Sequence, residues 1–247
     1  MKLLTVDNVK TIKGESLGWL TGILYLAPAF IADVKRSVCP YASPGCTTAC
    51  LYSAGRGCMS TVQRARIRKT REFWSNRQAF IDTLRHDIDA LARRAERQGM
   101  RAAVRLNGTS DLEFWRWLPM DEHSVQFYDY TKNFHRVAEY SAARKAYSAG
   151  PPFRATGNPA FPVNYHLTFS RSETNHAECV TVLRHGINVA AVFRNAPDKF
   201  EGYTVVNGDA HDLRFLDQES PAWVALTAKG DARRDTSGFV IVGGGAP

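Results

Sequence analysis

Long apolar runs, internal repeats and low-complexity segments are missing from this chain of 247 residues. Its longest apolar stretches, Trp19 to Leu26 and Val189 to Phe193, are far too short to cross a bilayer. Repeat architectures are excluded because no unit recurs, and no stretch has the composition of a linker. We therefore expect a single domain over residues 1–247 that makes no contact with a membrane.

An apolar signal segment is missing as well, because Met1 to Lys13 mixes apolar residues with Asp7 and three lysines. We expect a protein that is made and kept in the cytoplasm, where thiols stay reduced. A chain of this length can also bury a core without disulfide staples. Disulfides are therefore the weaker interpretation of the five cysteines.

Four of those cysteines lie in residues 38–59, which read VCPYASPGCTTACLYSAGRGCM. Proline, glycine and serine fill the intervals between the cysteines, so we expect a wrapped loop. Such a loop can bring several sulfurs to one point and hold a metal ion or a cluster. The candidate ligands are Cys39, Cys46, Cys50 and Cys58.

The paired C-x2-C knuckles that are typical of structural zinc sites do not occur in this segment. Its spacing is C-x6-C-x3-C-x7-C, spread along a glycine-rich stretch. Such spacing suits a [4Fe–4S] cluster better, because a cluster is larger than a single ion. Zinc stays open as the alternative.

An acidic excess is also lacking, since 32 Lys and Arg stand against 24 Asp and Glu and give a formal net charge of +8. This balance favours a polyanionic partner such as nucleic acid or a nucleotide. Basic residues are densest directly after the cysteine segment, where Arg64 and Arg68 belong to a run with helical periodicity. Phosphate contact and a solvated helix face are equally good interpretations of this run.

The rest of the chain alternates apolar and helical patterns. A buried strand is expected at residues 18–28, and an amphipathic helix is expected within residues 61–98. Further short apolar segments then occur at residues 102–106, 124–128, 164–169, 189–193, 203–206 and 223–226. This alternation predicts an α/β fold, either a full or partial (β/α) barrel or an open doubly wound sheet. The cysteine-rich loop would follow the first strand.

Polar side chains follow the predicted strands, and in α/β folds the carboxyl ends of the strands build the active site. Each of these side chains alone has an equally good interpretation as a cap or turn residue, but the set predicts a polar site beside the cysteines. The candidate catalytic acids are Asp111, Asp129, Glu173, Asp209 and Asp212. The candidate substrate contacts are Asn107, Thr109, Lys132, Ser170, Asn207, Arg214 and Lys229, with Arg64 and Arg68.

His166, Arg214 and Cys179 have two interpretations each. His166 lies in a predicted strand and is either a catalytic group, as proton donor or ligand, or a satisfied core residue. Arg214 stands between two acids and either pairs with them or contacts an anion. Cys179 is expected to be a packed core residue rather than a fifth ligand.

The strings CPYASPGCTTACL, RLNGTSD, YDYTK, NYHLTFSRSE, NGDAHDLRFLD and AKG resemble the phage protein family catalogued as gene product 88. The resemblance extends over most of the chain. It implies a phage-encoded protein that works in the cytoplasm of the host. It does not by itself imply a particular reaction.

A more distant likeness implies more chemistry. The C-x6-C-x3-C order with SPGC is similar to the C-x6-C-x2-C loop of another phage family, gene products 37 and 68, which resembles radical S-adenosylmethionine enzymes. That likeness implies a [4Fe–4S] cluster on three cysteines after the first strand of a partial barrel, with S-adenosylmethionine at the fourth iron. Cys58 departs from the pattern, since a fourth thiolate would fill the open iron.

Three functions are compatible with these features. The first is an iron–sulfur enzyme that modifies a nucleic acid base or a nucleotide and takes electrons from a donor protein. The second is a zinc-stabilised barrel enzyme that cleaves or exchanges a glycosidic bond in nucleic acid, with Asp111 or Asp209 as nucleophile or base. The third is a non-enzymatic nucleic-acid-binding protein, which ranks last because acids at the site would repel phosphate.

Overall fold

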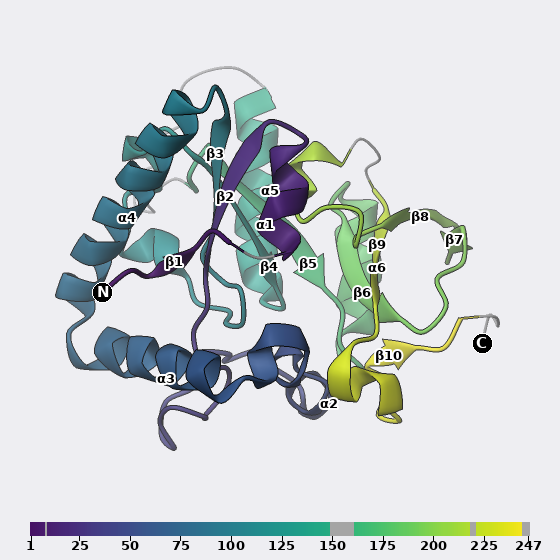
Figure 1. Ribbon diagram of the computed structural model, residues 1–247. Helices are drawn as coiled ribbons and strands as arrows, with labels where there is room; N and C mark the ends of the chain where they lie inside the picture. Colours follow the sequence, from purple (N-terminus) through teal and green to yellow (C-terminus); the bar gives the residue numbers. More distant parts are fainter. Residues whose placement is uncertain (8, 149–160, 218–220, 244–247) are drawn as a thin grey trace.

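The computed structural model describes residues 1–7, 9–148, 161–217 and 221–243. Its strands are β1 Leu4–Thr5, β2 Trp19–Leu24, β3 Arg101–Arg105, β4 Gln126–Thr131, β5 Tyr165–Ser170, β6 Val189–Phe193, β7 Lys199–Phe200, β8 Tyr203–Asn207, β9 Trp223–Thr227 and β10 Val240–Ile241. They form one sheet in the order β1-β2-β3-β4-β5-β6-β9-β8-β7, and β10 pairs with β6 (Figure 1). The predicted α/β class is therefore confirmed.

Neighbouring strands from β2 to β8 in this order all run parallel. Antiparallel pairing occurs at the two margins, where β1 meets β2 and β7 meets β8. Because the central strands are parallel, their carboxyl ends meet along one edge of the sheet. The sheet is open, with β1 and β7 at its ends, so the structure does not confirm a barrel.

The helices are α1 Val9–Glu15, α2 Pro44–Thr48, α3 Ser60–Ser75, α4 Arg77–Arg97, α5 Phe134–Ser148 and α6 His176–Arg184. Short 3₁₀ turns connect them: η1 Leu51–Ser53, η2 Gly55–Cys58, η3 Phe114–Arg116, η4 Met120–Glu122, η5 Arg214–Leu216 and η6 Gly230–Arg234. Among the described helices, none combines the length and the apolar character that crossing a membrane requires.

The single helix predicted within residues 61–98 is two helices, α3 and α4. Asn76 separates them, because its side-chain oxygen accepts a 3.3 Å hydrogen bond from the Ala79 N–H and caps the first turn of α4. The predicted apolar face of α4 is confirmed, since its members Phe80, Ile81, Leu84, Ile88, Leu91 and Ala95 are all buried. This face packs in the main core with the inward side chains of the sheet.

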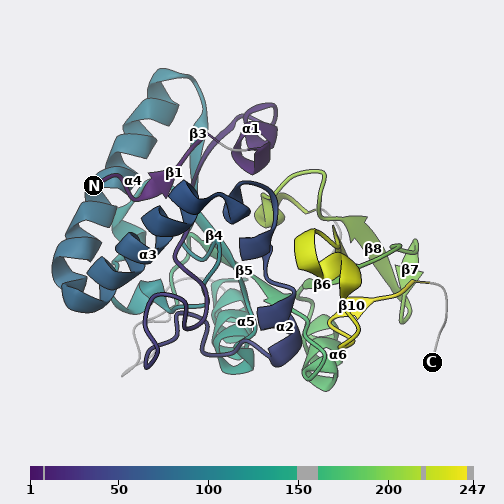
Figure 2. The same cartoon turned by 60° about the horizontal axis from the view of Figure 1, so that its bottom comes forward.

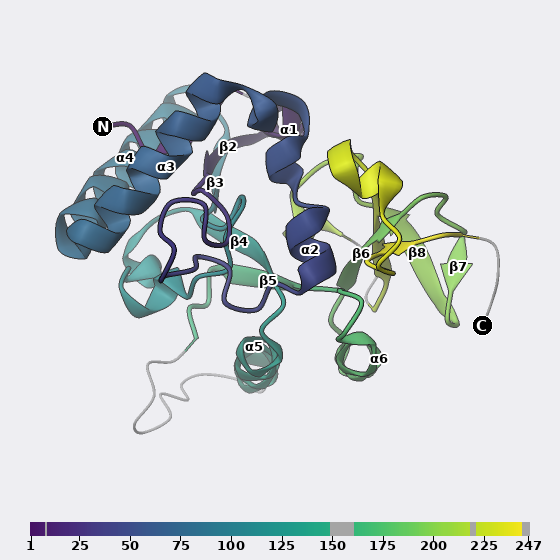
Figure 3. The ribbon, with the colours of Figure 1, turned by 90° about the horizontal axis from the view of Figure 1, so that it is seen from below.

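The cysteine segment, residues 38–59, lies between β2 and α3 and includes α2, η1 and η2. A small apolar cluster fixes α2, because Ala49 packs with Ala232 of η6 and Val240 of β10, and Cys46 lies against them. Figures 2 and 3 show α2 beside the C-terminal turn η6. Segments nearly two hundred residues apart therefore position the cysteines above the carboxyl ends of the strands.

Candidate functional site

A cavity of about 210 Å³ lies between the cysteine segment and the carboxyl ends of β3, β4, β5, β6 and β9. Ten of the residues predicted from the sequence line it: Cys39, Cys46, Cys50, Asn107, Thr109, Asp111, Lys132, Ser170, Asp209 and Lys229. Arg105, Tyr130 and Phe239 also line the cavity and were not among the sequence candidates. Strand alternation was the sequence signal that could have identified Arg105 and Tyr130, because alternate side chains of β3 and β4 lie on the cavity side.

Three thiols share one wall of this cavity. The Cys39 sulfur accepts a hydrogen bond from the Ala29 N–H at 3.4 Å. Burial raises the pKa of the Cys39 thiol to about 12, and the nearby Cys50 and Cys46 add to the shift. Burial also raises the pKa of the Cys50 thiol. Within the described ranges, no three His, Cys, Asp or Glu side chains are grouped closely enough to hold a single metal ion.

Cys58 lies apart from the other three cysteines. It ends η2, its side chain is exposed, and its thiol donates to the Gly55 carbonyl at 2.9 Å. Cys50 and Leu51 line the cavity, but Cys58 does not. The sequence led us to expect all four cysteines at one point. In the structure, Cys58 does not join the other three at the cavity.

Glu173, predicted to be catalytic, instead anchors α2. Its carboxylate accepts hydrogen bonds from the Ser43 hydroxyl and the Gly45 N–H, both at 2.7 Å. Partial burial opposes ionisation, but these hydrogen bonds outweigh it and lower the Glu173 pKa. A Cβ at Gly45 would clash with the Ser237 hydroxyl and the Glu173 carboxylate, so a larger residue there would have to displace the Glu173 side chain that anchors α2. Because Cys46 lies on α2, this contact fixes one of the cavity thiols.

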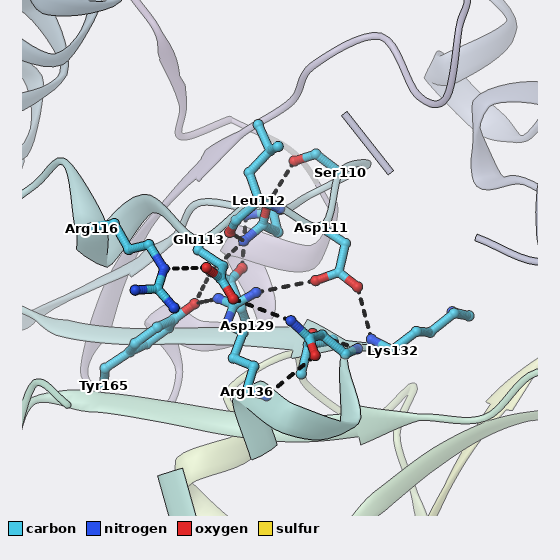
Figure 4. A network of polar contacts seen from close by, with 12 residues as sticks. Ser110, Asp111, Leu112, Glu113, Arg116, Asp129, Lys132, Arg136 and Tyr165 are labelled. Carbon is cyan, nitrogen blue, oxygen red and sulfur yellow. Dashed lines mark hydrogen bonds and ion pairs between the residues drawn. The ribbon is translucent and has the colours of Figure 1, made fainter. Parts of the chain in front are cut away.

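Asp129 supports the loop after β3 (Figure 4). Its carboxylate accepts from the backbone N–H of Asn107 at 2.7 Å, from the Asn107 amide at 3.0 Å and from the Tyr165 hydroxyl at 2.9 Å. Burial raises the Asp129 pKa to about 6, although Arg136 and Arg105 oppose the shift. Asp129 therefore lies behind the cavity wall and positions Asn107, which lines it.

Asp111 lines the cavity but is also engaged. One carboxylate oxygen accepts from the backbone N–H of Lys132 at 2.8 Å, and the other accepts from the Arg136 guanidinium at 3.1 Å (Figure 4). The Arg136 side chain is fully buried. These contacts fix the backbone at Lys132, directly after the end of β4.

Asp209 and Asp212 are likewise paired with cations. Asp209 accepts from the Lys229 ammonium at 2.5 Å and from the Thr227 N–H at 2.8 Å. Asp212 lies outside the cavity wall, where it accepts from Arg105 at 2.9 Å and from the Tyr128 hydroxyl at 3.1 Å. Every carboxylate predicted to be catalytic thus has a partner within the chain.

His166, Arg214 and Asn207 do not line the cavity. His166 is held by the Tyr140 hydroxyl at 3.1 Å, and burial lowers its pKa to about 4. Arg214 is buried and pairs with Asp217 at 3.3 Å. The Asn207 side-chain oxygen accepts from the backbone N–H two residues later, so it shapes a turn. These placements agree with the structural interpretation of each residue, and Cys179 is fully buried as expected.

The basic run of α3 is divided between two sides of the helix. Arg64 and Arg68 line a shallow outer groove, away from the cysteine cavity. Arg66 faces inward and is 8% exposed, with its guanidinium 4.7 Å from the Tyr25 ring centroid and 5.7 Å from that of Tyr52. Its Nε and Nη1 atoms have no hydrogen-bond partner among the described residues.

The comparisons with known proteins agree with the resemblance read from the motifs. The family model described as gene product 88 matches residues 2–243. No curated protein and no solved structure matches the chain, so the more distant likeness to radical S-adenosylmethionine enzymes has no support from them. The match covers nearly the whole sequence, including the cysteine segment and all the cavity residues, and the chain therefore belongs to the gene product 88 family.

Proposed function

We propose that this protein is an iron–sulfur enzyme that modifies a nucleotide or a nucleic acid base in the host cytoplasm. Cys39, Cys46 and Cys50 would hold a [4Fe–4S] cluster in the cavity. The observation that carries the proposal is that these three thiols, all from one segment, line the same cavity as polar residues at the carboxyl ends of parallel strands.

The donor set fits a cluster better than one ion. A tetrahedral zinc site holds its sulfurs roughly 4 Å apart. No three suitable ligands in the described part of the chain are grouped in that way. A cluster spreads its thiolate ligands over several irons and needs wider spacing. Three thiols that share a wall without meeting at one point agree with the larger centre.

Arg66 provides an independent test of the fit. An unpaired guanidinium is costly to bury unless a negative charge accompanies it. Arg66 stacks on Tyr52, two residues after Cys50, and has an electrostatic interaction with Cys50. A metal–thiolate centre at Cys50 would provide the missing negative charge, which a neutral thiol does not.

Three protein ligands leave one iron open. The exposed position of Cys58 supports three rather than four thiolate ligands, and that number would leave one iron for S-adenosylmethionine. We propose S-adenosylmethionine as the ligand of that iron, with an electron donor protein as partner. When bound there, the cofactor would supply a radical for the chemistry. The parallel part of the open sheet would then act as a partial barrel around the site.

The alternatives have less support. A glycosidic mechanism needs a carboxylate that is free to attack or to take a proton. Asp111 and Asp209, the two candidates, are both engaged by cations and backbone N–H groups. A non-enzymatic nucleic-acid-binding protein would use Arg64 and Arg68 as its contact surface, but this interpretation gives the thiol-lined cavity no role.

Anaerobic purification followed by iron, sulfide and zinc assays tests the proposal. We expect roughly four irons and four sulfides per chain, with broad absorption near ~400 nm. Separate replacement of Cys39, Cys46 and Cys50 by alanine should abolish cluster content. Cys58→Ala is the matched control and should keep it. A colourless protein with one zinc per chain, or loss of iron in Cys58→Ala, would contradict the proposal.

A further inference from the structure

Lys132 carries a positive charge at the cavity wall that no carboxylate of the described residues neutralises. The other two lining cations are paired, Lys229 with Asp209 and Arg105 with Asp212. The Lys132 ammonium instead donates to the Ser170 hydroxyl at 2.9 Å. No carboxylate of the described residues lies within ion-pair distance of it.

The backbone on both sides of this contact is fixed. Thr131 of β4 pairs with Phe169 of β5 in parallel register, which places Lys132 and Ser170 side by side at the ends of their strands. The Asp111 carboxylate accepts from the Lys132 N–H, and the Asn175 amide donates to the Ser170 carbonyl. The ammonium is therefore held in place at the cavity, with no counter-charge from the described part of the chain.

Arg105 brings a second cation to the same cavity. It is 7% exposed, its guanidinium lies 4.5 Å from the Tyr130 ring centroid, and its Nε has no hydrogen-bond partner among the described residues. The Ser170 hydroxyl accepts from Lys132, so its own hydrogen remains available to donate. The un-neutralised Lys132 ammonium, the Arg105 guanidinium that pairs with Asp212, and one hydroxyl donor thus line the same cavity as the thiols.

We propose that Lys132, Ser170 and Arg105 form an anion subsite that binds a phosphate group of the substrate. Phosphate carries up to two negative charges and accepts several charge-assisted hydrogen bonds, which matches this donor set. The inference rests on the proposed function for the cavity being a substrate site, and it narrows the substrate to a phosphorylated compound.

Titration calorimetry on the full chain tests this at low ionic strength, with iron content measured on the same samples. The probes are inorganic phosphate, adenosine monophosphate, adenosine and a short single-stranded DNA. Lys132→Met should weaken phosphate and adenosine monophosphate binding by about tenfold or more, and Lys132→Arg should retain most of it. Lys199→Met is the control, because it removes the same charge from exposed strand β7.

A matching loss for DNA would place a strand phosphate in the cavity, whereas a loss confined to the mononucleotide would support a free nucleotide. Equal phosphate affinity in Lys132→Met and the unmodified chain would overturn the subsite, as would absence of phosphate binding at millimolar concentration. Iron content separates the two proposals. A protein without iron that binds phosphate through Lys132 would contradict the cluster and keep the subsite.

Discussion

At the scale of single residues, buried charges around the cavity differ in how they are compensated. Arg136 meets Asp111, and Arg105 meets Asp212. Arg66 contacts the faces of two tyrosines but pairs with no acid among the described residues. Since a buried cation without a counter-charge is unfavourable, Arg66 distinguishes a chain with a thiolate-bound centre from one without it.

Replacing Arg66 by methionine should affect the iron-free and iron-loaded proteins differently. The iron-free protein should keep its stability to within about 1 kcal/mol, because an unpaired cation is exchanged for an apolar side chain. The iron-loaded protein should show a more negative midpoint potential, because cluster potentials depend on nearby charge. Urea denaturation and a spectroscopic redox titration measure the two effects. Arg64→Met is the control, and equal potentials in Arg66→Met and the unmodified chain would refute the assignment.

His166 should make the fold sensitive to acid. Burial lowers its pKa from 6.5 to about 4, so the unfolded chain binds the proton more readily over this interval. The stability that neutral His166 provides is therefore complete above pH 6.5 and is lost as pH falls towards 4, by about 3 kcal/mol in total. Urea denaturation from pH 7 to pH 4 should show a shallower decline for His166→Gln. An unchanged slope, or the same effect in the exposed His86→Gln, would contradict this.

At the scale of elements, the cysteine segment depends on contacts with the C-terminal half of the chain. Helix α2 has five residues and gains little stability on its own. Glu173 satisfies two donors at its start, and η6 and β10 pack on its other side. The position of Cys46 is therefore determined by residues more than a hundred positions away.

Glu173→Ala should release α2. Loss of an acceptor for two donors at a helix start typically costs about 1–2 kcal/mol. Cluster content should fall as well, because Cys46 would lose its fixed position. Chemical denaturation and an iron assay on the same preparation measure both effects. Glu96→Ala, on the exposed side of α4, is the matched control. Full iron content in Glu173→Ala would show that α2 does not need this anchor.

Much of this element structure was predictable from apolar patterning. The fully buried pattern of β2 and the strand at 189–193 matched continuous apolar runs. The break at Asn76 was missed because the helical period continues across it. The roles of the acids after the strands were harder to predict. A carboxylate that fixes a loop and one that acts on a substrate both follow a strand in the sequence. Only distant partners such as Tyr165 for Asp129 or Arg105 for Asp212 distinguish them.

At the scale of the whole molecule, the net charge of +8 should produce salt-dependent binding to nucleic acid. The outer groove of α3 presents Arg64 and Arg68 away from the thiol-lined cavity. A strand bound there would leave the cavity free for one nucleotide. The sequence left phosphate contact and a solvated helix face equally open for these arginines, and helical geometry turns them outward and Arg66 inward.

Removing each of these two arginines should make the affinity for single-stranded DNA less dependent on salt. The slope of log affinity against log salt for a single-stranded DNA should fall by about 1 for Arg64→Ala and again for Arg68→Ala. Fluorescence anisotropy at several salt concentrations measures the slope. Arg184→Ala on α6 removes the same charge elsewhere and should leave the slope unchanged. Equal slopes in all variants would exclude the α3 groove as the contact surface.

The most direct test of the account is the Mössbauer spectrum of the protein reconstituted with ⁵⁷Fe. Three cavity thiols and a remote Cys58 predict a [4Fe–4S] cluster in which one iron differs from the other three. That spectrum should be the same in Cys58→Ala, and S-adenosylmethionine should shift the distinct iron alone. Four equivalent irons that change when Cys58 is replaced, or no cluster at all, would contradict the central claim.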